Sequence, residues 1–196
     1  MIKIDFSFYI AILLALFSGQ MDVYLTYLIA LVIHECGHLL LATLFKWEIE
    51  TLKVSAIGGF LNFKNDLSKP AGEIIVVATG GILLNVITGA VILHIDGPPS
   101  LIYAQFAIGI FNLLPIAPLD GSKILEGIMR LFMTYHLVLK VMGILNLFFY
   151  GLFVLFITIF RLEQYLLVAV VLAVLIWKFR RAKPYVNQRY LIQKGN

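Results

Sequence analysis

Two histidines and a glutamate stand close together in the stretch His34-Glu35-Cys36-Gly37-His38. In a helix, residues four apart lie about 40° apart on one face and one turn apart along the axis, so both imidazoles can reach a single ion. Glu35 lies about 100° round from His34, beside that ion, whereas Cys36 faces away and is a poor candidate ligand. In this H-E-x-x-H arrangement two histidines bind zinc and the glutamate takes a proton from the attacking water. The spacing therefore predicts a hydrolytic metal site.

The motif lies inside an apolar segment, residues 23–45, which is long enough to cross a bilayer. A transmembrane helix needs about 20 mostly apolar residues. Ionisable side chains are costly at that depth, face the protein interior or a wet cavity, and indicate function by default. The alternative is a chance occurrence of the pattern in a core helix. The apolar surroundings disfavour it, because they would have to tolerate three ionisable groups without a use.

A second polar group follows a proline-rich stretch at residues 112–121, Asn-Leu-Leu-Pro-Ile-Ala-Pro-Leu-Asp-Gly. Pro115 and Pro118 end a helix here and free backbone groups that must be satisfied elsewhere. Asp120 comes directly afterwards and is the natural third ligand, since zinc held by two histidines and a carboxylate keeps its fourth position open. Alternatively, Asp120 caps a helix over residues 121–131. The two roles are compatible, because they can use different carboxylate oxygens.

Composition places the chain in a membrane. Its 196 residues are 61% hydrophobic and 13% charged, with a mean hydropathy of +0.97, which indicates a polytopic membrane protein rather than a soluble globule. We expect no cleavable signal peptide. The single cysteine excludes an intrachain disulfide, so an oxidising compartment is not required.

The formal charge of +4 follows the expected orientation of the spans. With both termini in the cytosol, the basic loops at 46–71 and 116–136 and the tail at 180–196 all lie inside, whereas the turns at 19–22 and 95–98 have no Lys or Arg. This is the positive-inside pattern. The basic residues therefore indicate topology and contact with anionic lipid, and no further feature favours a nucleic-acid partner.

We predict an all-α polytopic membrane protein with about six transmembrane helices. They are expected near residues 4–18, 23–45, 72–94, 99–115, 137–160 and 162–178. After the second, residues 52–63 form two short apolar runs around Gly58-Gly59, typical of a β-hairpin that is re-entrant or interfacial and covers the site. An ordinary cytosolic turn is the alternative. In the third span, Asn85 can bond across helices or orient a ligand, and its spacing favours the first.

Taken together, the two motifs resemble those of the site-2 protease family of intramembrane zinc metalloproteases, and its sporulation branch above all. Residues 34–38 match H-E-x-G-H and residues 112–121 match N-x-x-P-x-x-P-L-D-G. The resemblance implies that one Zn²⁺ per chain is held by His34, His38 and Asp120, with Glu35 as general base and acid. It also implies residues that support the site or bind the substrate, namely Asn112, Gly58, Gly59 and Asn85.

The chain departs from the family pattern at three points. Ile82 stands where proline is usual in a G-P-x-x-N motif, and Ser122 replaces a common second glycine. Sporulation-type members usually continue into a cytosolic CBS domain. We expect instead a transmembrane metalloprotease domain over residues 1–179 and a short basic cytosolic tail over residues 180–196, with no CBS domain in this chain.

The expected activity is zinc-dependent hydrolysis of a peptide bond, in or near the membrane, in a membrane-associated substrate such as a pro-sigma factor processed during sporulation. The expected location is a bacterial cell membrane or the membrane around the forespore. Expected partners are the substrate, the lipid bilayer and regulatory membrane proteins, and the oligomeric state is left open. One alternative is an ion or metal transporter, although we see one broken helix where a transporter favours paired ones. Another is a silent scaffold whose metal has four protein ligands.

Overall fold

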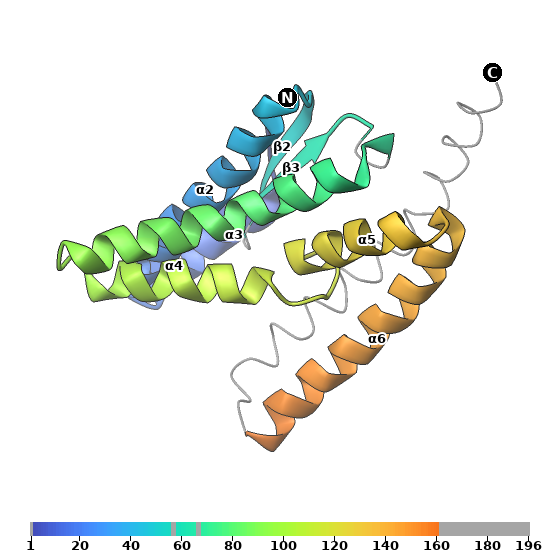
Figure 1. The fold of residues 1–196 in the computed structure, drawn as a ribbon. Helices are drawn as coiled ribbons and strands as arrows, with labels where there is room; N and C mark the ends of the chain where they lie inside the picture. Colours follow the sequence, from blue (N-terminus) through green and yellow to red (C-terminus); the bar gives the residue numbers. More distant parts are fainter. Residues whose placement is uncertain (1, 56–57, 66–67, 161–196) are drawn as a thin grey trace. The chain divides into compact units, whose positions relative to one another are not determined.

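The computed structural model describes residues 2–55, 58–65 and 68–160, and the chain divides into two compact units, Met1–Leu113 and Leu114–Asn196. Figure 1 shows the helices and strands of both units. The span expected near residues 162–178 and the tail expected at 180–196 lie outside the described residues.

Four helices belong to the first unit. They are α1 (Phe6–Phe17), α2 (Met21–Leu44), α3 (Ala71–His94) and α4 (Pro99–Asn112). Their positions agree with four of the expected spans. The 24-residue helices α2 and α3 are long and apolar enough to cross a membrane, whereas α1 and α4 have 12 and 14 residues. Helix α4 stops at Asn112, shortly before the first of the two prolines predicted to end it.

Glycines bring α2 and α3 into backbone contact. A Cβ atom at Gly37 would collide with the carbonyl of Gly80, and one at Gly80 would lie 2.5 Å from the Gly37 carbonyl oxygen. Small residues of this kind let membrane helices approach closely where lipid offers no hydrophobic drive for association. The contact sets the histidine-bearing turn of α2 directly against α3.

The first unit also contains a three-stranded sheet, with one strand before α2 in the chain and two strands after it. Strand β2 (Ile49–Ser55) pairs antiparallel with β3 (Gly58–Phe63), which confirms the predicted hairpin around Gly58-Gly59. Strand β1 (Ile2–Ile4), which was not predicted, pairs parallel with β2. The order β1-β2-β3 places β2 in the centre, so among the described strands β1 and β3 form the edges of the sheet.

A buried aromatic cluster fixes the base of the hairpin to the helices. Trp47 packs edge-to-face on Phe63 of β3, with ring centroids 5.3 Å apart, and both pack with Ala42 of α2 and Val77 of α3. The Trp47 indole N–H donates to the Glu73 carboxylate of α3 at 2.7 Å. The ends of the hairpin are thereby attached to both long helices of this unit.

The described part of the second unit contains α5 (Asp120–Phe132) and α6 (Tyr135–Ile159). Met129, Val138 and Met142 form its buried cluster. Helix α6 is long and apolar enough to cross a membrane over Tyr135–Phe156. With three such helices among the described residues and one small sheet, the predicted class of a mainly helical membrane protein is confirmed.

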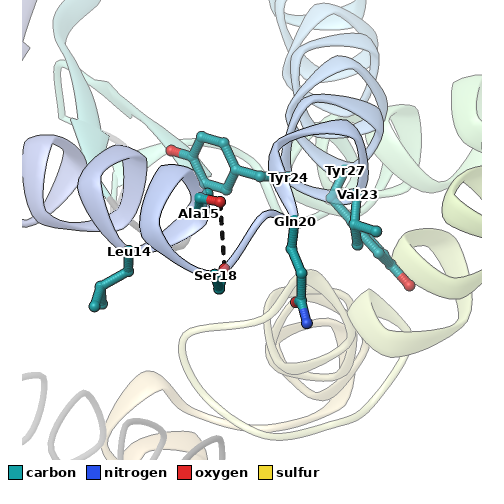
Figure 2. Close-up of a pocket in the computed structure, with 7 residues that line it drawn as sticks. All are labelled: Leu14, Ala15, Ser18, Gln20, Val23, Tyr24 and Tyr27. Atoms are coloured by element: carbon teal, nitrogen blue, oxygen red, sulfur yellow. Dashed lines mark hydrogen bonds between the residues drawn. The ribbon is translucent and has the colours of Figure 1, made fainter.

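A pocket of about 400 Å³ lies between the end of α1 and the start of α2. Figure 2 shows its lining side chains, with the Ser18 hydroxyl donating to the Ala15 carbonyl at 3.3 Å. The lining residues fall within 14–27, so the pocket is separate from the predicted metal ligands.

Candidate metal centre

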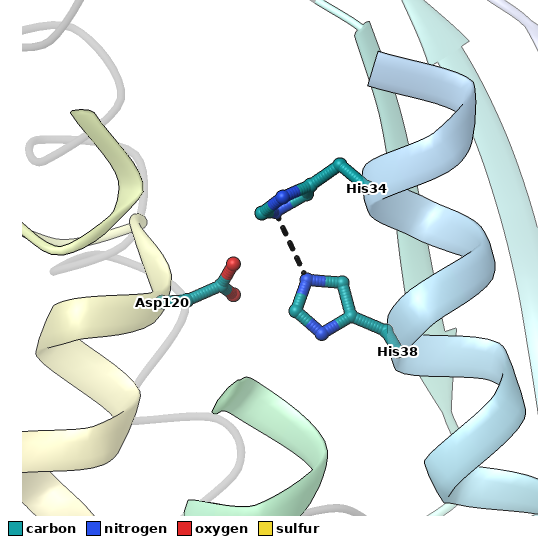
Figure 3. A group of neighbouring side chains, drawn as sticks. All are labelled: His34, His38 and Asp120. Carbon is teal, nitrogen blue, oxygen red and sulfur yellow. Dashed lines mark hydrogen bonds between the residues drawn. The ribbon is translucent and has the colours of Figure 1, made fainter. Parts of the chain in front are cut away.

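His34 and His38 face each other across one turn of α2. Their Nε2 atoms are 3.1 Å apart, as the dashed line in Figure 3 marks, and the two side chains are only 3% and 6% exposed. Cys36, between them in sequence, is exposed, in agreement with its predicted position on the far side of the helix. The one-turn spacing thus brings two ring nitrogens together in a buried place.

Partners on α3 determine which nitrogen of each ring carries hydrogen. His38 Nδ1 lies 2.8 Å from the carbonyl oxygen of Val77, which can only accept, so Nδ1 donates. His34 Nδ1 lies 2.6 Å from Asn85 Oδ1. The Asn85 amide is oriented by its Nδ2, which donates to the Ala30 carbonyl at 3.1 Å. Nδ1 of His34 therefore donates as well, and these tautomers are assigned from the hydrogen-bond partners.

Both Nε2 atoms consequently present lone pairs to the same point. Two acceptors 3.1 Å apart repel each other unless a proton or a cation lies between them. Imidazoles that donate through one nitrogen to a carbonyl or amide oxygen, and offer the other to a metal, are the usual arrangement around protein-bound zinc. The donor chemistry of this pair therefore fits a metal such as Zn²⁺.

Gly81 of α3 lies directly against this pair. A Cβ atom there would be 2.5 Å from His38 Nε2 and 2.7 Å from His34 Cε1. Real Cβ atoms essentially never make contacts that short. The absence of a side chain at this position is thus what leaves room for both rings.

Glu35 lies beside the hairpin. A Cβ atom at Gly59 would lie 3.1 Å from Glu35 Cγ and 3.6 Å from Cδ, so the backbone of β3 passes close to this half-buried carboxylate. The contact between Gly59 and Glu35 agrees with the expectation that the hairpin lies over the site. Gly58, the other predicted glycine, begins β3.

The predicted ligand from the second unit, Asp120, is 4% exposed and is the first residue of α5. The capping role considered for it does not hold, because Leu119 is the N-cap residue of α5. One Asp120 oxygen accepts from Lys123 Nζ at 3.0 Å. The loop before α5 is attached to α6, because the Ala117 N–H donates to Asn146 Oδ1 at 2.7 Å. Among the described residues, His34, His38 and Asp120 form the candidate group of metal-binding side chains, drawn in Figure 3.

Asn112 and Asn85 differ in what they contact. The Asn112 amide donates to the Ile108 carbonyl at 3.0 Å, one turn back on its own helix. Asn85 is fully buried and bonds both across helices and to His34, so the two interpretations considered for it are compatible.

No protein-family model matches the chain. It is 27% identical over 192 residues to stage IV sporulation protein FB of Bacillus subtilis (strain 168), and the match covers 92% of this chain and 66% of that protein. It is 30% identical over 111 residues to a zinc metalloprotease of Methanocaldococcus jannaschii, which covers 52% of this chain and 32% of that protein. The chain thus spans about two thirds and one third of the lengths of these relatives.

The solved structure of the site-2 protease from Methanocaldococcus jannaschii has the same fold. The TM-score is 0.67 at 21% identity, over 90% of this chain and 87% of that one. The likeness of this chain to the site-2 protease family is confirmed. The three described helices that are long and apolar enough to cross a membrane support a membrane protein.

The site-2 protease motifs do not include one buried polar residue next to the site. Gln105 of α4 is fully buried and accepts from Asn85 Nδ2. A signal was available, because a single amide within an apolar helix of a membrane protein is costly and indicates a role. The sequence gives no comparable signal for the Val77 carbonyl that accepts from His38, because every residue type has a backbone carbonyl.

Proposed function

We propose that this protein is an intramembrane zinc metalloprotease that hydrolyses a peptide bond of a membrane-associated substrate. The observation that carries the proposal is the pair of Nε2 lone pairs 3.1 Å apart, with both Nδ1 atoms engaged by α3. Relatives named as a zinc metalloprotease and a sporulation protein support the same reading.

In the proposed site, His34, His38 and Asp120 would hold the ion, and a set of three protein ligands would leave room for water or substrate. A bound zinc ion supplies Lewis acidity, which lowers the pKa of a water molecule and polarises a carbonyl. The remaining chemistry belongs to Glu35. Its carboxylate takes a proton from the attacking water and then delivers that proton to the leaving amine nitrogen. The adjacent β3 backbone restricts this side chain on one side.

The substrate is proposed to bind as an extended strand on the edge of β3 that no described strand covers. A helical peptide hides its carbonyls in i→i+4 hydrogen bonds, so the scissile segment must unwind before it can react. An extended segment can add to an exposed sheet edge and gain main-chain hydrogen bonds there. Of the two hairpin strands, β3 offers this edge, because β2 is paired on both sides and the β3 backbone passes close to Glu35.

For the natural substrate, the sporulation relative favours a membrane-associated pro-sigma factor. The expected location is a bacterial membrane with both termini in the cytosol. Transport is not favoured, since the relatives are named as proteases and a sporulation protein rather than as carriers.

The deciding experiment uses the detergent-purified protein and its Glu35→Gln variant. Cleavage of a membrane-associated pro-sigma factor, and in parallel of a single-span membrane protein, is followed together with zinc content. Loss of a general base lowers the rate by about 10²–10⁴-fold, whereas zinc content should stay near one per chain. Asp22→Asn, an acid-to-amide change in the first turn of the same helix, is the matched control and should retain activity. Undiminished cleavage by Glu35→Gln would refute the assignment.

A second variant tests the third ligand. Asp120→Ala should lower zinc content and cleavage together, because removal of a carboxylate leaves only two protein ligands. Asp22→Ala, the same acid-to-alanine change in the first turn of α2, is the control for this variant. If zinc and cleavage both survive the loss of Asp120, the third ligand is another residue.

A further inference from the structure

We propose that Gln105 is a positioning residue for His34, acting through Asn85. The inference rests on the proposed metal site, of which His34 is a ligand. Gln105 lies on α4, Asn85 on α3 and His34 on α2, so the three side chains form a line across the helices of the first unit.

The three residues are joined by direct hydrogen bonds in the interior. Asn85 and Gln105 are 0% exposed and His34 is 3% exposed. Asn85 Nδ2 donates to Gln105 Oε1 at 2.5 Å and to the Ala30 carbonyl at 3.1 Å, and Asn85 Oδ1 lies 2.6 Å from His34 Nδ1. Every polar atom of Asn85 is therefore engaged.

These hydrogen bonds determine which ring nitrogen of His34 carries the hydrogen. An amide group can be turned over, which exchanges its oxygen and nitrogen. Turned over, Asn85 would place its oxygen against two acceptors, Ala30 O and Gln105 Oε1, and its NH₂ against His34. The two acceptors together hold the oxygen toward His34 Nδ1, which must then carry the hydrogen. The lone pair is left on Nε2, the atom that faces His38.

The Gln105 side chain leaves one of its own polar atoms without a hydrogen bond. Within the part of the chain that the structure describes, its Nε2 is buried without a hydrogen-bond partner. Leaving a buried donor unpaired carries a desolvation penalty. Gly89 of α3 packs on it so closely that an added Cβ atom would lie 3.2 Å from Gln105 Cβ. A leucine or methionine would fill the same space without the unpaired amide, so helix packing alone does not account for glutamine here.

The test compares Gln105→Met, which keeps the length and removes the acceptor, with Gln105→Glu, which keeps an acceptor oxygen. Ile108→Val, a change on the same face of α4 without a hydrogen bond, is the control. The first readout is the His34 tautomer in the metal-free protein, by ¹⁵N NMR of histidine-labelled samples, with His34→Gln identifying its signals among the four histidines. The second is zinc affinity by chelator competition.

We expect Gln105→Met to move part of the His34 population to the Nε2–H form and to weaken zinc binding about 10-fold, the low end for outer-shell partners of a metal ligand. Gln105→Glu and Ile108→Val should resemble the unaltered protein. In an Asn85→Ala background, Gln105→Met should have no further effect, because the connection to His34 is already broken.

The proposal is overturned if Gln105→Met leaves both the His34 tautomer and the zinc affinity unchanged. It is also overturned if Gln105→Met weakens zinc binding by the same factor in the Asn85→Ala background as in the unaltered protein. If Gln105→Met does not fold, Gln105→Glu decides, and a shifted tautomer in that variant counts against the proposal. The NMR readout needs no metal. A protein that binds no zinc but shows the expected tautomers would therefore refute the proposed function and leave the role of Gln105 standing.

Discussion

Gly81→Ala is the sharpest perturbation of the metal site, because it adds one methyl group and removes nothing. The new Cβ atom would lie 2.5 Å from His38 Nε2 and 2.7 Å from His34 Cε1. Both distances are far below an ordinary contact, which is about 3.5 Å between non-bonded heavy atoms. One or both rings, or the helices that carry them, must therefore move by about 1 Å.

The effects on stability and on metal binding differ in size. Overpacking destabilises the folded protein by about 1–3 kcal/mol, and replacing glycine by alanine in a helix stabilises it by about 1 kcal/mol. The free energy of unfolding should therefore fall by only about 0–2 kcal/mol. Metal–ligand distances tolerate about 0.2 Å. A displacement of about 1 Å at a positioned group costs on the order of 100-fold, so zinc affinity should fall by at least that factor.

The assay is zinc affinity by chelator competition, beside thermal unfolding of the same samples. Gly72→Ala is the matched control, since it makes the same change in the first turn of α3, where an added Cβ atom meets nothing within 4 Å. It should bind zinc normally and be slightly stabilised. Zinc binding by Gly81→Ala at the unaltered affinity would show that the two Nε2 atoms are not the metal-binding atoms.

Three further changes test the supports of the site. Trp47→Phe removes the indole N–H that donates to the Glu73 carboxylate, and should lower the free energy of unfolding by about 1.5–3 kcal/mol. Chemical denaturation measures this change, and a difference within error would contradict a structural role for the hydrogen bond. Asn146→Ala leaves a buried loop N–H unpaired and should cost about 1–3 kcal/mol, seen as earlier thermal unfolding, with unaltered unfolding as the contrary result. The Lys53 hydrogen bond, followed by that from a backbone N–H, lowers the pKa of Asp5 below its ordinary value. Its stabilisation is therefore present above about pH 4 and lost as the pH falls through the lowered pKa, so the stability difference between the protein and Asp5→Asn should shrink in acid and stay constant around neutral pH.

The helices and the hairpin could be predicted because their signals are local. Apolar length gave the positions of α2, α3 and α6, and the alternating runs around Gly58-Gly59 gave the antiparallel pair. Strand β1 could not be predicted in this way. It has three residues, too few for a pattern, and its partners on β2 are some fifty positions away, with Ile2 opposite Leu52. Parallel pairing of that kind depends on tertiary contacts alone.

The candidate site was predictable to a similar extent. The one-turn spacing of His34 and His38 follows from helix geometry and needs no tertiary information. Which ring nitrogen faces inward does not follow from it, because the partners of Nδ1 are a backbone carbonyl at Val77 and an amide on α3. The capping role considered for Asp120 was wrong by one residue, since α5 begins at Asp120 itself. Helix boundaries are the least certain part of any reading from sequence.

The histidine half of the site is organised entirely within the first unit. Val77 and Asn85 orient the two rings, and the glycine contacts between α2 and α3 leave them room. The two Nε2 atoms are 3.1 Å apart and repel each other unless a proton or a cation lies between them, and a metal ion bound to both would remove that repulsion. Metal binding should therefore favour the tautomers in which the two Nδ1 atoms donate to Asn85 and Val77 of α3. The conformational cost of arranging these ligands is met during folding, which leaves more of the binding free energy for holding the ion.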